Sequence, residues 1–353
     1  MTMDYNFLSK DDSLYLKGLA ILLIVLHNFF IKIPPVTLAN EFFFHISFLQ
    51  EAWNNFSVTE SLNIVLSFIG YGGIYIFFFL SGYGLSKKMR LNDDPFYAIK
   101  RIWQLEKLLL IGLVVYLIFN PLSFNFLHII NALSLTNNFF VKNLHQIEGS
   151  WWFLFCLAQL YVIFYPLYRF IGKNKNNFLL IIYLYIMLAY IGSPLSILLE
   201  DDEFFYRIFI GHIPEFCLGI FVATYENSLP LLQNKKTYFY ALTVGIIIFI
   251  LCQLTFWLWI FSGLAFVAIF ISSYKLLKGY VANKYIKYLG KISPYVYIIH
   301  CVLLLHFFTD MVKNSSAYEK IMSCALWFCV VLLAGGLLSK LFALPILKRC
   351  GDK

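Results

Sequence analysis

A long apolar run near the N-terminus, residues 14–33, constrains the fold of this chain more than any other feature. Its length of about 20 residues is what an α-helix needs to cross a bilayer core of about 30 Å. The run carries Lys17 near one end and His27 deep inside. Ionisable groups are costly in lipid and usually face a bundle interior or a watery cavity, so each is a candidate functional residue. A structural His27 that hydrogen-bonds a neighbouring helix is an equally open interpretation.

The composition indicates a polytopic membrane protein. Hydrophobic residues make up 61% of the 353 residues, charged residues 13%, and the mean hydropathy is +0.75, whereas soluble domains average about 25% charged residues. Apolar runs recur from end to end, so we expect a single membrane domain over residues 1–353. The polar start before Leu14 and the length of the first run predict a retained first span and no cleaved signal peptide. The seven cysteines form no CxxC pair, so neither a disulfide framework nor a zinc site is predicted.

Hydropathy predicts an all-α integral membrane protein with about ten transmembrane helices. Basic residues concentrate in the links that follow the even-numbered spans and in the C-terminal tail, whereas the other links are poor in base. By the positive-inside bias, both termini are predicted to be cytoplasmic. The expected spans are 14–33, 62–85, 103–120, 151–171, 178–198, 204–225, 238–254, 256–274, 292–310 and 320–345.

Two of the predicted external links are long, 34–61 and 121–150. The first carries the acidic residues Glu41 and Glu51. The second contains an apolar piece, 124–135, which is too short to span and is expected to be interfacial or re-entrant. These links are either plain solvated connectors or the mouth of an external site.

Short motifs that contain ionisable, aromatic or small residues lie along these spans. Each is weak alone, because small residues serve helix packing and interfacial tryptophans form ordinary aromatic belts. Their order along one chain is more specific. In chain order they are Lys17-Gly18-Leu19-Ala20 with His27-Asn28, the stretch 72–83 with Ser81-Gly82, Ser150-Trp151-Trp152, His212-Ile213-Pro214-Glu215, and Ser293-Pro294-Tyr295-Val296-Tyr297 followed by His300.

This order resembles the membrane acyltransferase-3 family, integral enzymes that acylate extracytoplasmic sugars, over essentially the whole chain. The family's first span has a basic residue, a glycine, an alanine-containing run and a histidine. Its later features are an FFxxSG stretch, a basic opening of the third span, a Trp-led span and a Ser-x-Tyr-x-Tyr-x-x-His pattern. The matching residues here are Lys17, Gly18, Ala20 and His27, then Phe77, Phe78, Ser81 and Gly82, then Lys100-Arg101, the span 151–171 and residues 293–300.

One departure from the family pattern lies in the first span. Nine residues separate Lys17 from His27, where the usual motif has ten, so Asn28 occupies the usual histidine position. At 100° per residue the usual pair lies nearly on one helix face, whereas the present pair is turned apart by about 80°. No other histidine lies in this span.

The resemblance implies transfer of an acyl group, expected to be acetyl, from cytoplasmic acyl-CoA to a hydroxyl of an extracytoplasmic or lipid-linked sugar. The reaction needs a base near neutral pH, and His27 is the predicted base, with Glu215 as a second catalytic candidate. Cationic side chains suit the phosphates of the donor. The predicted donor-binding residues are Lys17, Arg101, Lys100 and Ser81, and the predicted cavity or acceptor residues are Asn28, Trp152, Ser293, Tyr295, Tyr297 and His300.

Structural roles are serious alternatives for most of these residues. Basic loop residues occur in nearly every polytopic protein, and Ser81 is more typical of helix packing than of chemistry. Glu215 fits a buried ion pair or a packed neutral carboxyl as well as it fits orienting the imidazole or binding the acceptor. The late aromatic residues and His300 suit lining or bracing a cavity better than reacting.

No metal, bound cofactor or nucleic acid is expected, and acyl-CoA enters as a co-substrate. The expected partners are the bilayer, the acyl donor, a glycan acceptor and proteins of glycan assembly, and the expected location is the cell membrane, plasma or inner. The alternative function is a transporter or flippase for a lipid-linked glycan, in which the buried ionisable residues mark a substrate path. Inverted repeats would support that alternative, and the sequence shows none.

Overall fold

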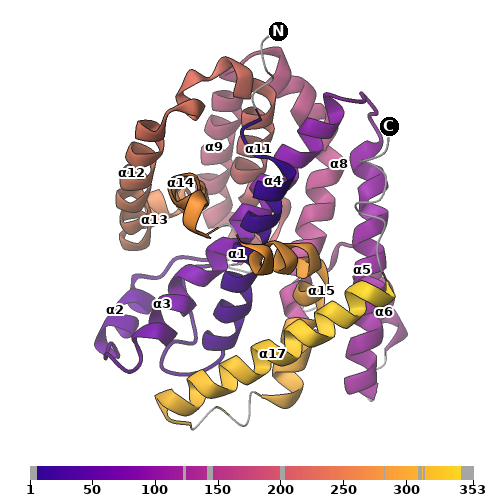
Figure 1. Cartoon of the computed structure of the whole chain (residues 1–353), viewed down its shortest axis with the longest axis vertical. Coiled ribbons are helices and arrows are strands. Elements are labelled where there is room, and N and C mark those ends of the chain that lie inside the picture. The colour runs from indigo at the N-terminus through magenta and orange to yellow at the C-terminus, as the bar shows by residue number, and fades with distance from the viewer. Residues whose placement is uncertain are drawn as a thin grey trace.

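The computed structural model describes residues 6–121, 125–140, 146–198, 203–281, 283–308, 312 and 315–342. Over these residues the chain is helical without strands, which confirms the predicted all-α class (Figure 1). Several parts of the predictions lie outside the described residues: 122–124 and 141–145 of the link 121–150, the last two residues of the 292–310 span, the last residues of the 320–345 span, and the basic C-terminal tail.

Seven helical segments of the described chain are long and apolar enough to cross a membrane, and each coincides with a predicted span. Two of them consist of more than one helix. The segment Ser61–Met89 comprises α3 (Ser61–Ile69), a short 3₁₀ turn and α4 (Gly73–Met89). The segment Gly149–Lys173 comprises a 3₁₀ turn and α8 (Trp152–Lys173). The other five are α1 (Lys10–Phe30), α5 (Tyr97–Phe119), α12 (Lys235–Leu254), α15 (Lys284–Phe307) and α17 (Ala317–Leu341).

The three remaining predicted spans are also helical, but they are not among these seven segments. The segment 178–198 lies in α9 (Asn176–Leu198), and 256–274 is split between α13 (Phe256–Trp259) and α14 (Ser262–Val281). The total of about ten spans and the cytoplasmic termini therefore stay predictions.

The predicted span 204–225 is not one helix. It divides into α10 (Phe204–Arg207), the 3₁₀ turn η5 (Phe209–His212) and α11 (Ile213–Tyr225). Ile208 between the first two is extended, with φ −105° and ψ 170°. Pro214 lies in the first turn of α11, where its missing N–H costs no helical hydrogen bond. Hydropathy alone does not detect this break, because the average over the whole segment stays apolar in spite of Arg207, His212 and Glu215.

Capping residues set several helix starts ahead of the apolar runs. α1 begins before Leu14 because Ser9 and Asp12 form a capping box, in which Ser9 Oγ accepts from the Asp12 N–H at 3.1 Å and the Asp12 carboxylate accepts from the Ser9 N–H at 3.0 Å. α15 begins at Lys284 because Asn283 Oδ1 accepts hydrogen bonds from the backbone N–H groups of Tyr285 and Ile286, at 3.0 and 2.9 Å. Polar caps therefore lengthen these helices beyond their hydrophobic segments.

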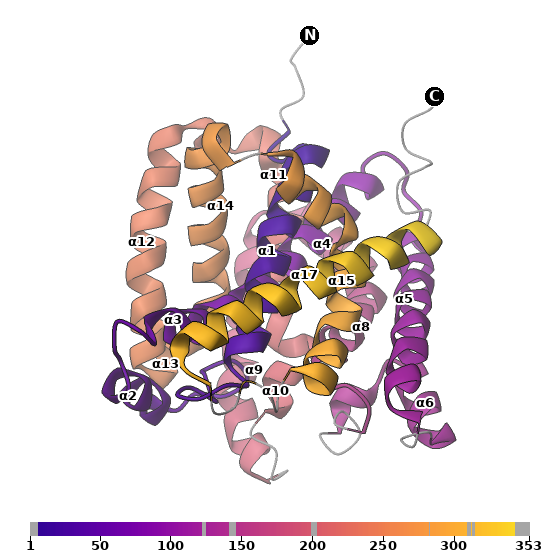
Figure 2. The same ribbon diagram turned by 60° about the horizontal axis from the view of Figure 1, so that its bottom comes forward.

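The helices form one bundle around α1 (Figures 1 and 2). α12 and α14 pack together on one side, and α5 with the short α6 (Phe126–Leu133) lies on the other. α17 crosses the outside obliquely and packs against α15. In Figure 2 the first turn of α1 lies toward the upper end of the bundle, and α2 (Ile46–Asn54) lies at the lower left, beside the lower end of α12.

Glycines bring α4 and α11 into backbone contact. A Cβ on Gly82 would lie 2.1 Å from the Phe216 carbonyl oxygen, and a Cβ on Gly219 would lie 2.1 Å from the Phe79 carbonyl oxygen. Real Cβ atoms do not approach oxygen so closely, so each position requires glycine. Such close approach drives helix association in a bilayer, where burial of apolar surface adds little.

We expect Gly82→Ala to destabilise the protein and Gly84→Ala, on the same helix, to leave it unchanged. An alanine at Gly82 must push α4 and α11 apart, at a cost of about 1–3 kcal/mol, whereas a Cβ at Gly84 has nothing within 4 Å. Thermal unfolding of the two variants in detergent checks this. Equal unfolding temperatures for both would contradict the close packing.

Candidate functional site

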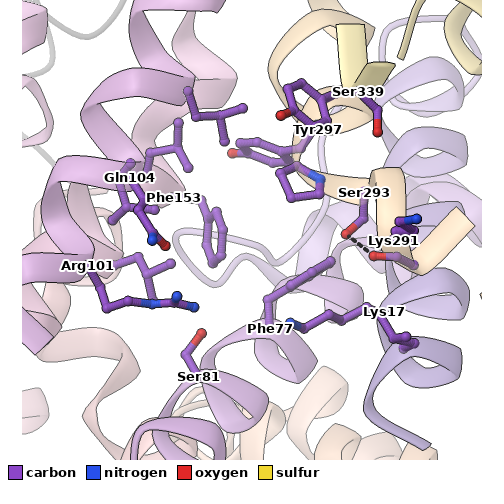
Figure 3. Close-up of a pocket in the computed structure, with 18 of the residues that line it drawn as sticks. Lys17, Phe77, Ser81, Arg101, Gln104, Phe153, Lys291, Ser293, Tyr297 and Ser339 are labelled. Carbon is purple, nitrogen blue, oxygen red and sulfur yellow. Dashed lines mark hydrogen bonds between the residues drawn. The ribbon is translucent and has the colours of Figure 1, made fainter. Parts of the chain in front are cut away.

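A cavity of about 600 Å³ lies between α1, α4, α5, α8, α15 and α17 (Figure 3). Arg101 of α5 and Ser81 of α4 point toward one another in it, and Lys17 enters from α1 on the opposite side. The predicted residues that line this cavity are Lys17, Ser81, Arg101, Ser293, Tyr295 and Tyr297. Six residues chosen from four separate stretches of sequence thus meet around one space.

Four cationic side chains line the cavity, Lys17, Arg101, Lys291 and Lys340. Lys17 and Arg101 are half-buried, and the two others are exposed at the edge. Among the described residues no carboxylate forms an ion pair with any of the four. Cations gathered without a paired carboxylate suit an anionic ligand, and guanidinium groups suit phosphate in particular.

Lys100 does not line this cavity, although it was predicted with Arg101 as a donor-binding residue. The Lys100 ammonium pairs with Asp94 at 2.7 Å on the exposed side of α5, and this hydrogen bond lowers the pKa of Asp94. The cavity face of α5 consists of Arg101, Gln104, Leu105 and Leu108, which follow helical spacing. A step of 100° turns the preceding lysine away from that face.

His27 lies in a separate, buried environment with 3% of its surface exposed. Its Nδ1 lies 2.9 Å from the Ser67 carbonyl oxygen, and its Nε2 lies 3.3 Å from Glu41 Oε2. A carbonyl oxygen only accepts, so Nδ1 carries a hydrogen and Nε2 is the nitrogen free to exchange a proton. The amide of Asn28, the next residue, donates to the Ile24 carbonyl one turn back at 3.0 Å.

Trp152 and Glu215 surround another buried imidazole, His212. The ring centroids of Trp152 and His212 lie 5.4 Å apart, and Glu215 Oε2 lies 4.0 Å from His212 Nδ1. The structure gives Glu215 no hydrogen bond to His27, the other predicted catalytic residue. Phe42 of the long link 34–61 packs edge-on against Trp152 at 5.0 Å.

The late motif braces the cavity wall. Ser293 Oγ donates to the Gly290 carbonyl at 2.9 Å, Tyr295 donates to the Phe342 carbonyl at 2.9 Å, and Tyr297 donates to the Ser150 carbonyl. His300 is fully buried behind this wall, where its Nδ1 donates to the Tyr297 carbonyl at 2.6 Å. These bonds agree with the bracing role considered from the sequence.

Four residues that the sequence prediction missed belong to these two environments: Glu41 beside His27, and Gln104, Lys291 and Lys340 in the cavity. Gln104 was detectable, because it lies three residues after Arg101 on one helix face. Glu41 was not, since spacing along an irregular link does not predict a contact. Among the described residues, no group of three or more histidine, cysteine or acidic side chains could hold a metal ion.

The fold and the site define a helical membrane protein with a cationic cavity and a buried imidazole–carboxylate pair. The family model described as an acyltransferase domain matches residues 13–343. The chain therefore belongs to the acyltransferase-3 family, and it is a membrane acyltransferase. No curated protein and no solved structure matches it.

Arg101→Ala should raise the apparent KM for acetyl-CoA about tenfold or more, because a hydrogen bond between charged groups contributes roughly 1.5–3 kcal/mol. Lys100→Ala should change it little, since that side chain points away from the cavity and pairs with Asp94. Initial rates at varied acetyl-CoA concentration distinguish the two variants. Equal changes in this KM for both variants would mean that the cavity does not bind the acyl donor.

Proposed function

We propose that this chain transfers an acyl group, most simply acetyl, from cytoplasmic acyl-CoA to a hydroxyl of an extracytoplasmic or lipid-linked sugar. The observation that carries the proposal is the cavity in which Lys17, Arg101, Lys291 and Lys340 gather, with no carboxylate of the described chain paired to any of them. Family membership supplies the reaction class. The proposal also includes the predicted ten spans, cytoplasmic termini and a location in the cell membrane.

The cavity suits a donor with anionic and apolar parts. Its cationic side chains would hold the phosphates of CoA, with Arg101 offering a bidentate fork and Ser81 a hydroxyl opposite it. Phe77 and Phe153 supply an apolar wall for the pantetheine arm. Phe153 packs against Tyr297 at 5.3 Å and Phe78 at 5.0 Å, so an aromatic layer borders the cavity.

The proposed base is His27 through Nε2. The acceptor hydroxyl oxygen attacks the thioester carbonyl carbon while Nε2 takes its proton. The C–S bond then breaks, and the imidazolium gives this proton to the departing sulfur, which releases CoA as the thiol and restores the neutral ring. The Ser67 carbonyl holds Nδ1–H and thereby fixes the tautomer that this step requires. Glu41 faces the same nitrogen that gains the proton, so its carboxylate would stabilise the resulting imidazolium.

Mass spectrometry of surface glycans from cells with and without this protein tests the proposal. Loss of an acyl group from one glycan, with the amount of glycan unchanged, is the expected result. Loss of the glycan from the surface, with its precursor retained inside and acylation otherwise intact, would instead favour the transporter alternative.

His27→Ala and His27→Gln should both abolish acylation while membrane insertion and yield stay near normal. Glutamine can replace the hydrogen bonds of a structural histidine, but it takes up no proton at neutral pH. Asn28→Ala is the control and should have a much smaller effect, because its side-chain amide hydrogen-bonds the Ile24 carbonyl within α1. If His27→Gln keeps most of the activity, the base must be sought at His212 or His300.

Glu41→Gln should lower kcat at least tenfold and leave the KM for acetyl-CoA unchanged, since a neutral amide does not stabilise the imidazolium that forms in the reaction. Glu51→Gln, an exposed acid of the same link, is the matched control and should behave like the unaltered protein. Steady-state kinetics with purified protein measure both constants. An unchanged kcat would mean that Glu41 only anchors the link.

A further inference from the structure

A second imidazole–carboxylate pair, His212 and Glu215, is buried without complete hydrogen bonding. The two side chains are 3% and 2% exposed. His212 Nε2 donates to the Tyr206 carbonyl at 2.9 Å, so the lone pair of the neutral ring lies on Nδ1. Nδ1 and Glu215 Oε2 are buried atoms that have no hydrogen-bond partner among the residues that the structure describes. The distance of 4.0 Å between them is too long for a direct hydrogen bond.

Two such atoms side by side indicate a place for a ligand oxygen. Buried polar atoms in proteins nearly always have partners, because leaving them without one is unfavourable. One oxygen atom placed off the line that joins His212 Nδ1 and Glu215 Oε2, about 2.8 Å from each, would form a hydrogen bond with both. A hydroxyl is suited to this position, since it donates to the lone pair of Nδ1 and accepts from Glu215 when that carboxyl carries its proton.

The surroundings of this pair are aromatic. The Phe78 ring stacks on His212 at 4.4 Å and an angle of 19°, and the rings of Trp152 and Tyr75 lie at 5.4 and 5.9 Å from it. A few polar atoms among large aromatic faces are typical of sites for small organic ligands. A sugar ring offers both matching parts, apolar C–H faces and hydroxyl groups.

The pair is connected to the His27 environment through aromatic contacts on two sides. Tyr71 packs against His27 at 5.8 Å and against Tyr75 at 5.9 Å, and Tyr75 contacts His212. On the other side, Phe42 follows Glu41 in the chain and packs against Trp152. The two imidazole–carboxylate pairs therefore border one aromatic region.

We propose that His212 and Glu215 bind a second hydroxyl of the same acceptor whose first hydroxyl is acylated at His27. This inference rests on the proposed function and narrows its substrate class. The acceptor is a sugar or another polyol with at least two free hydroxyls, and a simple alcohol is a poor substrate. His212 and Glu215 hold the acceptor in position, and His27 alone takes the proton.

Gly263→Ala tests this proposal without changing either member of the pair. A Cβ on Gly263 would lie 1.8 Å from Glu215 Oε1, so the carboxyl group must move away. Gly279→Ala, on the same helix α14, is the matched control, because a Cβ there has nothing within 4 Å. The assay uses purified protein, acetyl-CoA, and surface glycan isolated from cells that lack this protein.

We expect Gly263→Ala to raise the KM for the glycan about tenfold and to leave the KM for acetyl-CoA unchanged, whereas Gly279→Ala changes neither. Glu215→Met is a second variant that removes the unpartnered carboxyl from an apolar site. It should raise the KM for the glycan as well, while the unfolding temperature in detergent stays the same or rises. A higher KM for the glycan together with an equal or higher unfolding temperature would mean that the carboxyl of Glu215 serves ligand binding and does not stabilise the fold.

An unchanged KM for the glycan in folded Glu215→Met would overturn the proposal and leave a structural water as the occupant of the pair. A lower unfolding temperature with an unchanged KM would do the same. Where Gly263→Ala does not fold, Glu215→Met decides alone. Failure of the unaltered protein to acylate any glycan would instead count against the proposed function, which keeps the two failures distinct.

Discussion

The contact of α1 with α4 and α15 is the constraint on which the rest of the structure depends. A Cβ on Gly18 would lie 2.1 Å from the Ile286 carbonyl oxygen, and one on Gly290 would lie 1.8 Å from the Leu14 carbonyl oxygen. On the other side, a Cβ on Gly73 would lie 2.4 Å from the Ala20 carbonyl oxygen. Backbones this close fix α1 in depth and in rotation, because a small slide would create a collision at each glycine.

This fixed helix carries both Lys17 and His27, so it sets the distance between the cavity and the proposed base. Ten positions along an α-helix correspond to about 15 Å. A donor whose phosphates bind at Lys17 therefore needs an extended arm to bring its acyl carbon to His27. The pantetheine arm of CoA is such an extended chain. The aromatic layer around Phe153 borders the cavity that this arm would enter.

The sequence predicted the parts of the structure that follow from periodicity. Apolar runs located the seven candidate spans, and motif order selected six residues that line the cavity. It failed where local chemistry decides: the capping box of Ser9 lengthens α1, and the break at Ile208 divides an apolar segment. Lys100 was assigned to the cavity by adjacency in sequence, although helical phase turns it toward Asp94.

Glu41 shows a different limit. It lies in an irregular link, where no periodicity relates its position to that of a helix, and its contact with His27 depends on how the whole link folds back over α3 and α12. Asn40 anchors that fold, because its carbonyl accepts from the Trp259 indole at 2.9 Å and its side chain accepts from the His45 N–H at 3.0 Å. Tertiary contacts of this kind are not encoded in the spacing of residues near His27.

The unusual spacing of Lys17 and His27 has a direct structural account. The usual motif places its two residues nearly on one helix face, and here they are turned apart by about 80°. α1 is one continuous α-helix from Lys10 to Phe30, without a proline in it. Instead the two residues meet different neighbours: Lys17 lines the cavity with α5 and α15, and His27 faces Ser67 at the end of α3 and Glu41 of the link. The roles proposed for them, phosphate binding at Lys17 and proton transfer at His27 about 15 Å away, do not need a common face, and separate faces let each residue meet its own partners.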